Sequence, residues 1–141
     1  MILSVKISLS ELRNLQKNFN WDRPTKCPIC SHNLWGHGYS LRYFNACLEG
    51  LYVKRWRCSS CRLILICRPE GYWRRYQESI STIYKVLLYR VKNLRWPPWI
   101  TRQKPGHWIR KLISHAKINL IIKESLITTI CFYRDKNLAI F

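Results

Sequence analysis

Cys27-Pro-Ile-Cys30 is one of two matching motifs in this chain, and the other is Cys58-Ser-Ser-Cys61. In each motif two residues separate the cysteines, which lets the backbone curl into a turn whose amides face the sulfurs. Two such turns brought together place four thiolates at the corners of a tetrahedron, the geometry of closed structural zinc sites. The motifs therefore predict one structural Zn²⁺ ion, bound by Cys27, Cys30, Cys58 and Cys61.

Other uses of these cysteines have less support. A thioredoxin-like redox pair needs one motif beside a β-α-β pattern, whereas here two motifs flank predicted β structure. Four cysteines can also hold an iron–sulfur cluster. The chain has seven cysteines, an odd number that argues against a fully paired disulfide framework. We expect the remaining thiols and two nearby histidines to bind no metal: Cys47, Cys67, Cys131, His32 and His37.

The sequence around the motifs predicts β structure. Residues 51–57 alternate apolar and polar side chains at a period of two, as a half-buried strand does. The 27 residues between the motifs (31–57) leave room for a hairpin, with residues 34–41 as its first strand. Residues 63–67 form a short apolar run that Pro69 ends, which predicts a third strand. The four cysteines would thus brace a three-stranded antiparallel sheet.

Helical patterns lie on either side of this predicted ribbon. Residues 8–20 carry leucines at helical spacing, and Ser8 with Glu11 has the form of a capping box. Residues 72–94 carry an apolar stripe with a basic opposite face. After a stiff connector with two adjacent prolines, a second basic helix begins near Pro105. Its inward face comprises Trp108, Ile109, Leu112 and Ala116.

These patterns predict an α+β protein, a small zinc ribbon followed by basic helices that form a helix-turn-helix variant. The domain boundaries that follow are an N-terminal helical segment over residues 1–24 and the zinc ribbon over 25–70. A basic helical region covers residues 71–124, and residues 125–141 are a tail whose order the sequence does not determine.

Charge is the second strong feature of the chain. There are 25 lysines and arginines against 7 acidic residues, which gives a formal net charge of +18. Self-repulsion at this charge opposes compaction, so a polyanionic partner is the natural explanation. The basic residues are interspersed with aromatic residues, as in proteins whose rings stack on bases. We expect nucleic acid as the partner, with duplex DNA favoured. A basic surface without a specific target is the simpler alternative.

Membrane attachment is the weaker explanation of the charge. The first nine residues lack the long apolar core of a secretory signal and include Lys6. The apolar stretch 118–130 is interrupted by Lys123 and Glu124. The sequence therefore predicts a cytoplasmic protein without a membrane partner, and it gives no oligomeric state.

Thirteen polar residues in predicted structured segments are the candidate nucleic-acid contacts. Seven lie in the ribbon or just after it: Arg42, Lys54, Arg55, Arg57, Arg62, Arg74 and Arg75. Six lie at the start of the second basic helix, whose amino end is suited to enter a groove: Arg102, Gln103, Lys104, His107, Arg110 and Lys111.

Residues 27–76 resemble the amino-terminal zinc ribbon of bacterial insertion-sequence transposases and their small accessory proteins. Beyond the two cysteine motifs, the resemblance is carried by Trp35-Gly-His-Gly38, Arg42-Tyr-Phe44, Lys54-Arg-Trp-Arg-Cys58 and Arg68-Pro-Glu-Gly-Tyr-Trp73. In those proteins a DNA-binding helix-turn-helix unit follows the ribbon, and Thr101-Arg-Gln-Lys104 opening a helix is compatible with one. The resemblance implies a DNA-binding accessory protein of a mobile element that acts beside a transposase.

The chain departs from that family in its connector and in its acidic residues. The connector 95–105 is longer than the tight turn of a helix-turn-helix. The few acidic residues are scattered, so no two-metal catalytic constellation can be assembled from them. We therefore expect no enzymatic activity. Two alternatives stay open, an RNA-binding protein whose aromatic residues stack on unpaired bases and a zinc-structured adaptor for an acidic protein.

Overall fold

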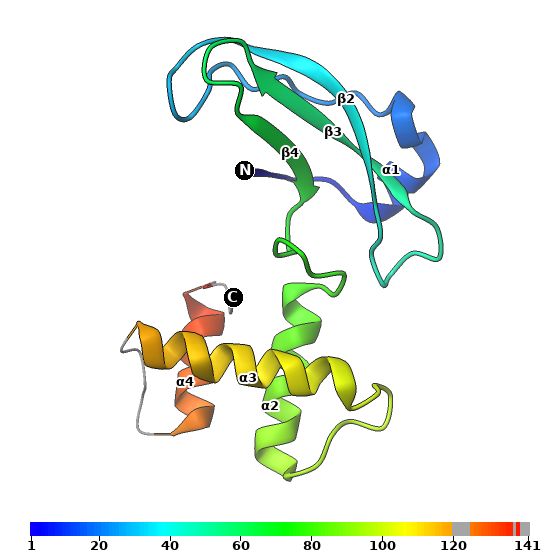
Figure 1. Cartoon of the computed structure of the whole chain (residues 1–141). Coiled ribbons are helices and arrows are strands. Elements are labelled where there is room, and N and C mark those ends of the chain that lie inside the picture. Colours follow the sequence, from blue (N-terminus) through cyan, green and yellow to red (C-terminus); the bar gives the residue numbers. More distant parts are fainter. Residues whose placement is uncertain (120–124, 137, 139–141) are drawn as a thin grey trace. The chain divides into compact units, whose positions relative to one another are not determined.

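A computed structural model describes residues 1–119, 125–136 and 138 of the chain. The chain divides into two units, Met1–Glu78 and Ser79–Phe141, which are considered one at a time (Figure 1). The first unit holds a β-sheet and one short helix, and the second is helical. The fold is therefore α+β, as the sequence predicts.

The sheet of the first unit has four strands among the described residues: β1 (Ile2–Val5), β2 (Leu34–Arg42), β3 (Leu51–Cys58) and β4 (Ile64–Pro69). Their order is β1-β4-β3-β2. β3 pairs antiparallel with both of its neighbours, whereas β1 runs parallel to β4 with Ile2 opposite Ile66. The prediction of a three-stranded antiparallel sheet is therefore wrong, because the sheet is four-stranded and mixed. β1 escaped prediction because its partner strand is some sixty residues away and no turn signal links them.

β2 bends at an irregularity in its pairing with β3. The register shifts between Gly36 and Tyr39, and Gly38 has a φ of +68°. Only glycine adopts this left-handed conformation without a steric cost from a Cβ atom. Beyond the shift, Tyr39 is opposite Lys54, so an aromatic ring and an ammonium group meet across the two strands.

A short helix, α1 (Leu9–Leu15), packs against β3 and completes the core of the first unit. Ser8 caps it, because its hydroxyl accepts a hydrogen bond from the Glu11 amide at 3.1 Å. The helix ends at Gln16, whose φ is +47°, and one turn of 3-10 helix (Gln16–Asn18) follows. The core joins both layers and contains Leu12, Trp21, Leu34, Phe44, Leu51, Val53, Trp56, Leu65 and Cys67.

The described part of the second unit contains α2 (Ile80–Asn93), α3 (Gln103–Ile118) and α4 (Leu126–Asp135). α2 contacts both of the other helices. It begins later than the predicted span 72–94, because residues 70–79 form turns and Ser79 caps the helix. α4 lies in the segment 125–141, whose order the sequence does not determine, and Ser125 caps it with a complete capping box.

The predicted inward face of the second basic helix is largely confirmed. Trp108, Leu112 and Ala116 of α3 are buried, and Ile109 is half-buried. The basic helical region predicted over residues 71–124 ends with residues 120–124, which lie outside the described residues. Over the described ranges, no helix is both long and apolar enough to cross a membrane.

Candidate metal centre and basic cavities

The two cysteine motifs form similar turns in the first unit. In the first, the Cys27 amide donates to the His32 carbonyl at 2.8 Å, and the Ser31 amide donates to the Cys27 carbonyl at 2.9 Å. In the second, the Cys58 amide donates to the Leu63 carbonyl at 2.9 Å. The residue after each motif has a left-handed backbone, with φ of +56° at Ser31 and +58° at Arg62. The same local geometry thus turns both cysteine pairs toward one point.

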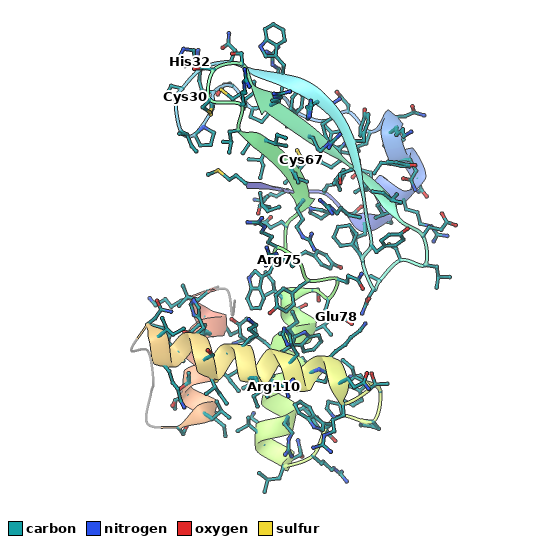
Figure 2. The ribbon with its side chains drawn as sticks, in the orientation of Figure 1. Cys30, His32, Cys67, Arg75, Glu78 and Arg110 are labelled. Atoms are coloured by element: carbon teal, nitrogen blue, oxygen red, sulfur yellow. The ribbon has the colours of Figure 1, made fainter. Side chains whose placement is uncertain are left out.

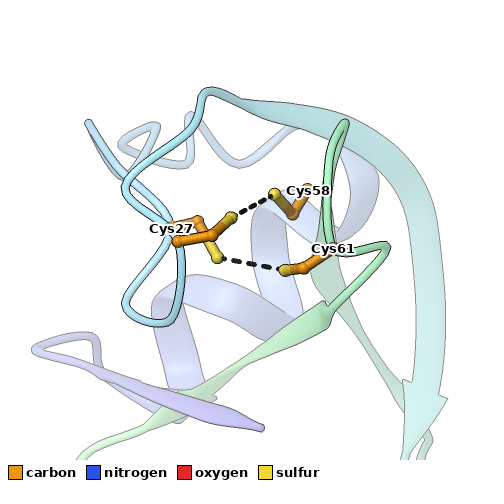
Figure 3. A group of neighbouring side chains, drawn as sticks. Cys27, Cys58 and Cys61 are labelled. Carbon is orange, nitrogen blue, oxygen red and sulfur yellow. Dashed lines mark hydrogen bonds between the residues drawn. The ribbon is translucent and has the colours of Figure 1, made fainter.

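The four sulfur atoms lie close together. Cys27 Sγ is 3.6 Å from Cys61 Sγ, and Cys30 Sγ is 3.3 Å from Cys58 Sγ (Figure 3). All four sulfurs lie within 4.8 Å of one another. A tetrahedral ion with metal–sulfur bonds of about 2.3 Å places its sulfurs about 3.8 Å apart. All four thiols are free. The predicted ligands therefore form a cluster that could hold a metal ion.

The proton affinities of these thiols differ widely because they share one small volume. The His32 amide and the Cys58 thiol lower the pKa of Cys30 to about 5. Burial raises the pKa of Cys27, but hydrogen bonds from the Cys30 and Ile29 amides outweigh it and the net shift is downward. The Leu63 amide lowers the pKa of Cys61, yet burial and the other thiols raise it to about 12. Four thiolates cannot coexist here unless a cation offsets their charge.

Among the described residues, the cluster of possible metal ligands consists of these four cysteines and includes no histidine or carboxylate. His32 Nδ1 is 2.8 Å from the Cys30 carbonyl oxygen, and His32 is not a member of the cluster of four cysteines. Figure 2 places Cys30 and His32 at one end of the sheet, with Cys67 further along it. Cys67 is buried in the core, and burial raises the pKa of its thiol. It is a packed thiol, unlike the four ligand candidates.

In both units, lysine and arginine side chains contact aromatic rings more often than they pair with carboxylates. The Lys54 ammonium is 4.5 Å from the Tyr39 ring centroid, and the Arg90 guanidinium is 5.3 Å from the Trp96 centroid. Such contacts orient a cation without neutralising it. In contrast, one ion pair occurs among the described residues, between Arg134 and Asp135 at 2.8 Å. The positive charge is therefore ordered and left available to an external anion.

Two of the predicted contacts lie beside the cluster of four cysteines. Arg57 and Arg62 line a cavity of about 250 Å³ together with Trp35, His37 and Cys58. Cys58 is also one of the four clustered cysteines. A metal ion there would fix the backbone that carries these two arginines.

Three further predicted contacts line a second cavity in the first unit. Arg42 ends β2, and Arg74 and Arg75 lie in the turns after β4. They share a cavity of about 380 Å³ with Arg68. Arg68 was not among the predicted contacts, although a charged residue in an otherwise apolar strand is a signal that could have identified it.

In the second unit, the amino end of α3 borders a third cavity. Arg102, Gln103 and Arg110 line a volume of about 450 Å³ with Arg90 of α2 and Trp96 of the connector. Arg90 and Trp96 were not predicted as contacts. No acidic residue lines any of the three cavities described here.

The remaining predicted contacts line none of these cavities. Lys54 sits over the Tyr39 ring, and Arg55 is half-buried with its Nε lacking a hydrogen-bond partner within the described part of the chain. Lys104, His107 and Lys111 are exposed along α3. The predicted contacts thus fall into two groups in the first unit, one in the second, and a scattered remainder.

No protein-family model, curated protein or solved structure matches this chain.

Proposed function

We propose that this chain is a zinc-structured nucleic-acid-binding protein, and that it serves a mobile element as a DNA-binding accessory protein beside a transposase. The observation that carries nucleic-acid binding is the gathering of arginines into cavities that no acidic residue lines. Guanidinium groups match phosphate oxygens in a bidentate geometry. The formal charge of +18 adds a long-range attraction to any polyanion.

Zinc is the metal that best suits the cluster. Four thiolates in a closed tetrahedral arrangement are typical of structural zinc sites. The ion would neutralise thiolate charge and tie the turn at residues 27–30 to the turn between β3 and β4. β3 and the turn after it carry Arg57 and Arg62, and β4 carries Arg68, so loss of the metal would disturb the cavities that these arginines line.

Duplex DNA is the favoured polymer because of the second unit. The amino end of α3 presents free amides and the positive end of the helix dipole. Arg102 and Gln103 lie at this end, and Arg110 lies about two turns further along the helix. The link to transposition rests on the resemblance of residues 27–76 to transposase zinc ribbons, since the fold alone does not specify a biological role.

Binding of single-stranded RNA is a second candidate, and exposed aromatic rings favour it. The exposed fractions are 58% for Trp35, 55% for Tyr43 and 59% for Trp99. Exposed rings of this kind stack on unpaired bases. Each of these rings lies beside a cation. The Arg23 guanidinium is 4.9 Å from the Trp35 centroid, and the Lys85 ammonium is 5.9 Å from the Trp99 centroid. Tyr43 lines the cavity that contains Arg42.

Competition between the two polymers tests the proposal. The zinc-loaded full chain is titrated with labelled duplex DNA and then competed with single-stranded RNA of the same length. The duplex affinity should fall with salt, with a slope of log K on log salt of about −0.9 per neutralised phosphate. Arg110→Ala should reduce that slope by about one unit. Lys117→Ala, on the same helix but lining none of the cavities, is the matched control.

Three outcomes are decisive. Preference for the duplex supports the accessory-protein proposal, and preference for RNA supports the second candidate. A duplex affinity that does not change between low and physiological salt would contradict phosphate-driven binding of either kind.

A further inference from the structure

Arg68 is a buried cation whose neighbours leave its hydrogen bonding incomplete. It lies in β4 and is 7% exposed. Its Nη2 donates to the Tyr76 carbonyl, and its guanidinium lies 5.1 Å from the Phe44 ring centroid. The buried Nε has no partner among the described residues, and no carboxylate there pairs with the charge. A buried charge left in this state is costly unless an anion completes it.

The surroundings of Arg68 add positive charge instead of offsetting it. Burial lowers the pKa of Arg68, and the neighbouring Arg42 lowers it further. Arg74 and Arg75 line the same cavity, so four guanidinium groups from three segments converge on about 380 Å³. Glu78, at the end of the adjacent turns, is hydrogen-bonded to the Asn45 side chain and is not one of the lining residues. The cavity is therefore assembled from like charges that repel one another when it is empty of anions.

The backbone after β4 holds this arrangement in an uncommon conformation. Arg75 has a φ of +67°, and Gly71 has a φ of +86°. A residue with a Cβ atom is uncommon in this left-handed region, and it persists only where the surrounding structure over-determines it. Tyr76 helps to do so, because its amide donates to the Trp73 carbonyl at 3.2 Å and its carbonyl accepts from Arg68. The turn thus fixes two arginines of the cavity relative to β4.

The size and lining of the cavity narrow the chemistry of its ligand. Its volume falls at the lower end of the range for small-molecule sites, about 300–1,000 Å³, which is more than a lone phosphate needs. The lining also includes the apolar or aromatic side chains of Leu41, Tyr43 and Ile2, which suit a sugar or a base. An internal phosphodiester carries one negative charge, whereas a phosphomonoester carries about −1.5 to −2 at pH 7. Four convergent guanidinium groups favour the more highly charged species.

We propose that the cavity formed by Arg42, Arg68, Arg74 and Arg75 binds a phosphomonoester of nucleotide type. The group is either the terminal phosphate of a nucleic-acid strand or the phosphate of a free nucleotide. The strand-end source rests on the proposed function, whereas the free-nucleotide source does not. The site recognises an end, in contrast to the contacts along the backbone that net charge alone supplies.

The test compares matched oligonucleotides on the zinc-loaded full chain. One duplex with a single-stranded overhang is prepared with a 5′-phosphate, with a 3′-phosphate and with hydroxyl ends, and affinities are measured at fixed salt. Adenosine monophosphate and inorganic phosphate serve as competitors. At least one of the two phosphorylated duplexes should bind about tenfold more tightly than the duplex with hydroxyl ends, as expected for added charge-assisted hydrogen bonds. Arg74→Ala and Arg68→Gln should reduce that ratio below twofold.

Controls separate loss of the site from loss of the fold. Arg13→Ala removes an exposed arginine of the same unit outside the cavity, and it should leave the tenfold ratio intact. Arg74 is exposed, so its variant keeps the test decisive if Arg68→Gln does not fold. Zinc content and melting curves report the fold of each variant.

Each outcome bears on one proposal. Preference for a phosphorylated end, without measurable binding of free adenosine monophosphate or phosphate, supports the strand-end source. Binding of adenosine monophosphate that depends on Arg74 supports the free-nucleotide source. If no oligonucleotide binds as well, the result also contradicts the proposed function. Equal affinity for phosphorylated and hydroxyl ends, with no binding of adenosine monophosphate or phosphate, overturns the inference while leaving general nucleic-acid binding in place.

Discussion

His115 of α3 and Tyr133 of α4 form a hydrogen bond, with His115 Nδ1 3.0 Å from the Tyr133 hydroxyl oxygen. Their rings also meet edge to face, with centroids 5.8 Å apart. Tyr133 is completely buried, so its hydroxyl has been removed from water and depends on this partner. The contact joins two helices that the sequence alone does not pair.

Tyr133→Phe removes this bond while keeping the ring. We expect a loss of about 0.5–1.5 kcal/mol in the free energy of unfolding, the usual net contribution of such a bond. Urea unfolding followed by circular dichroism measures it. A double-mutant cycle with His115→Ala isolates the pair from other effects of each change. Equal stability of Tyr133→Phe and the wild type would contradict the role given to this bond.

Metal removal should act on the first unit. A strong chelator, or Cys58→Ser, should unfold the turns that carry the four cysteines, because metal binding adds directly to folding. Elemental analysis should find about one zinc per chain in the native protein and a small fraction of it in the variant. Cys47→Ser is the matched control, since Cys47 lies in the same unit outside the cluster, and it should retain full zinc. Equal loss from both variants is incompatible with the site.

α3 separates a packing residue from a surface residue. Trp108 is buried, so Trp108→Ala should lower the free energy of unfolding by about 3–5 kcal/mol through the cavity it leaves. Arg110 is exposed, and Arg110→Ala should leave the melting temperature nearly unchanged while weakening nucleic-acid binding. Thermal unfolding of both variants decides between these roles. A large fall in the melting temperature of Arg110→Ala would mean that this side chain supports the fold.

Two tyrosines of the second unit predict a loss of stability at alkaline pH. Burial raises the pKa of Tyr84, as does the neighbouring Tyr133, and burial raises the pKa of Tyr133 itself. In the unfolded chain both ionise near pH 10, about their ordinary value. Their contribution is therefore fully present below pH ~10 and is lost as the pH rises toward the folded values, because the unfolded state releases its protons first.

Unfolding titrations at pH 8, 10 and 11 measure this dependence. Tyr84→Phe should be less stable at pH 8, since it loses a 2.8 Å hydrogen bond to the Leu138 carbonyl, and its stability should fall less steeply above pH 10. Identical slopes in the variant and the wild type would contradict the assignment to Tyr84. Lysines titrate in the same range, so the comparison between the two proteins, and not the absolute slope, is decisive.

Short-range patterns in the sequence predicted most of the helices and strands whose residues lie close together in the chain. The strands around the cysteine motifs and the buried face of α3 follow from alternation and from helical spacing, both of which are visible in short windows. Ser8 predicted the start of α1 because a cap acts within three residues. β1 did not follow, since four residues that pair in parallel with a distant strand have no local signature. The mixed sheet was therefore missed while its antiparallel part was predicted.

Part of the candidate site could also be predicted from short-range patterns, and part could not. The four clustered cysteines were predicted from spacing alone, because a metal imposes the same ligand geometry on any chain that binds it. Net charge predicted a basic surface but not its grouping. Arg68 and Arg90 belong to cavities whose walls come from separate segments, so only the folded chain brings them beside Arg42 and Arg110.

The parallel pairing of β1 with β4 sets an order in which the first unit can be completed during synthesis. Residues 2–5 leave the ribosome well before the strand beside which they lie, which ends at residue 69. Cys27 and Cys30 likewise emerge well before Cys58 and Cys61. Until then, Cys27 and Cys30 lack the other two cysteines of the cluster, and β1 lacks the strand with which it pairs. A nascent chain stalled before residue 58 should therefore be the form most open to oxidation and to capture by chaperones.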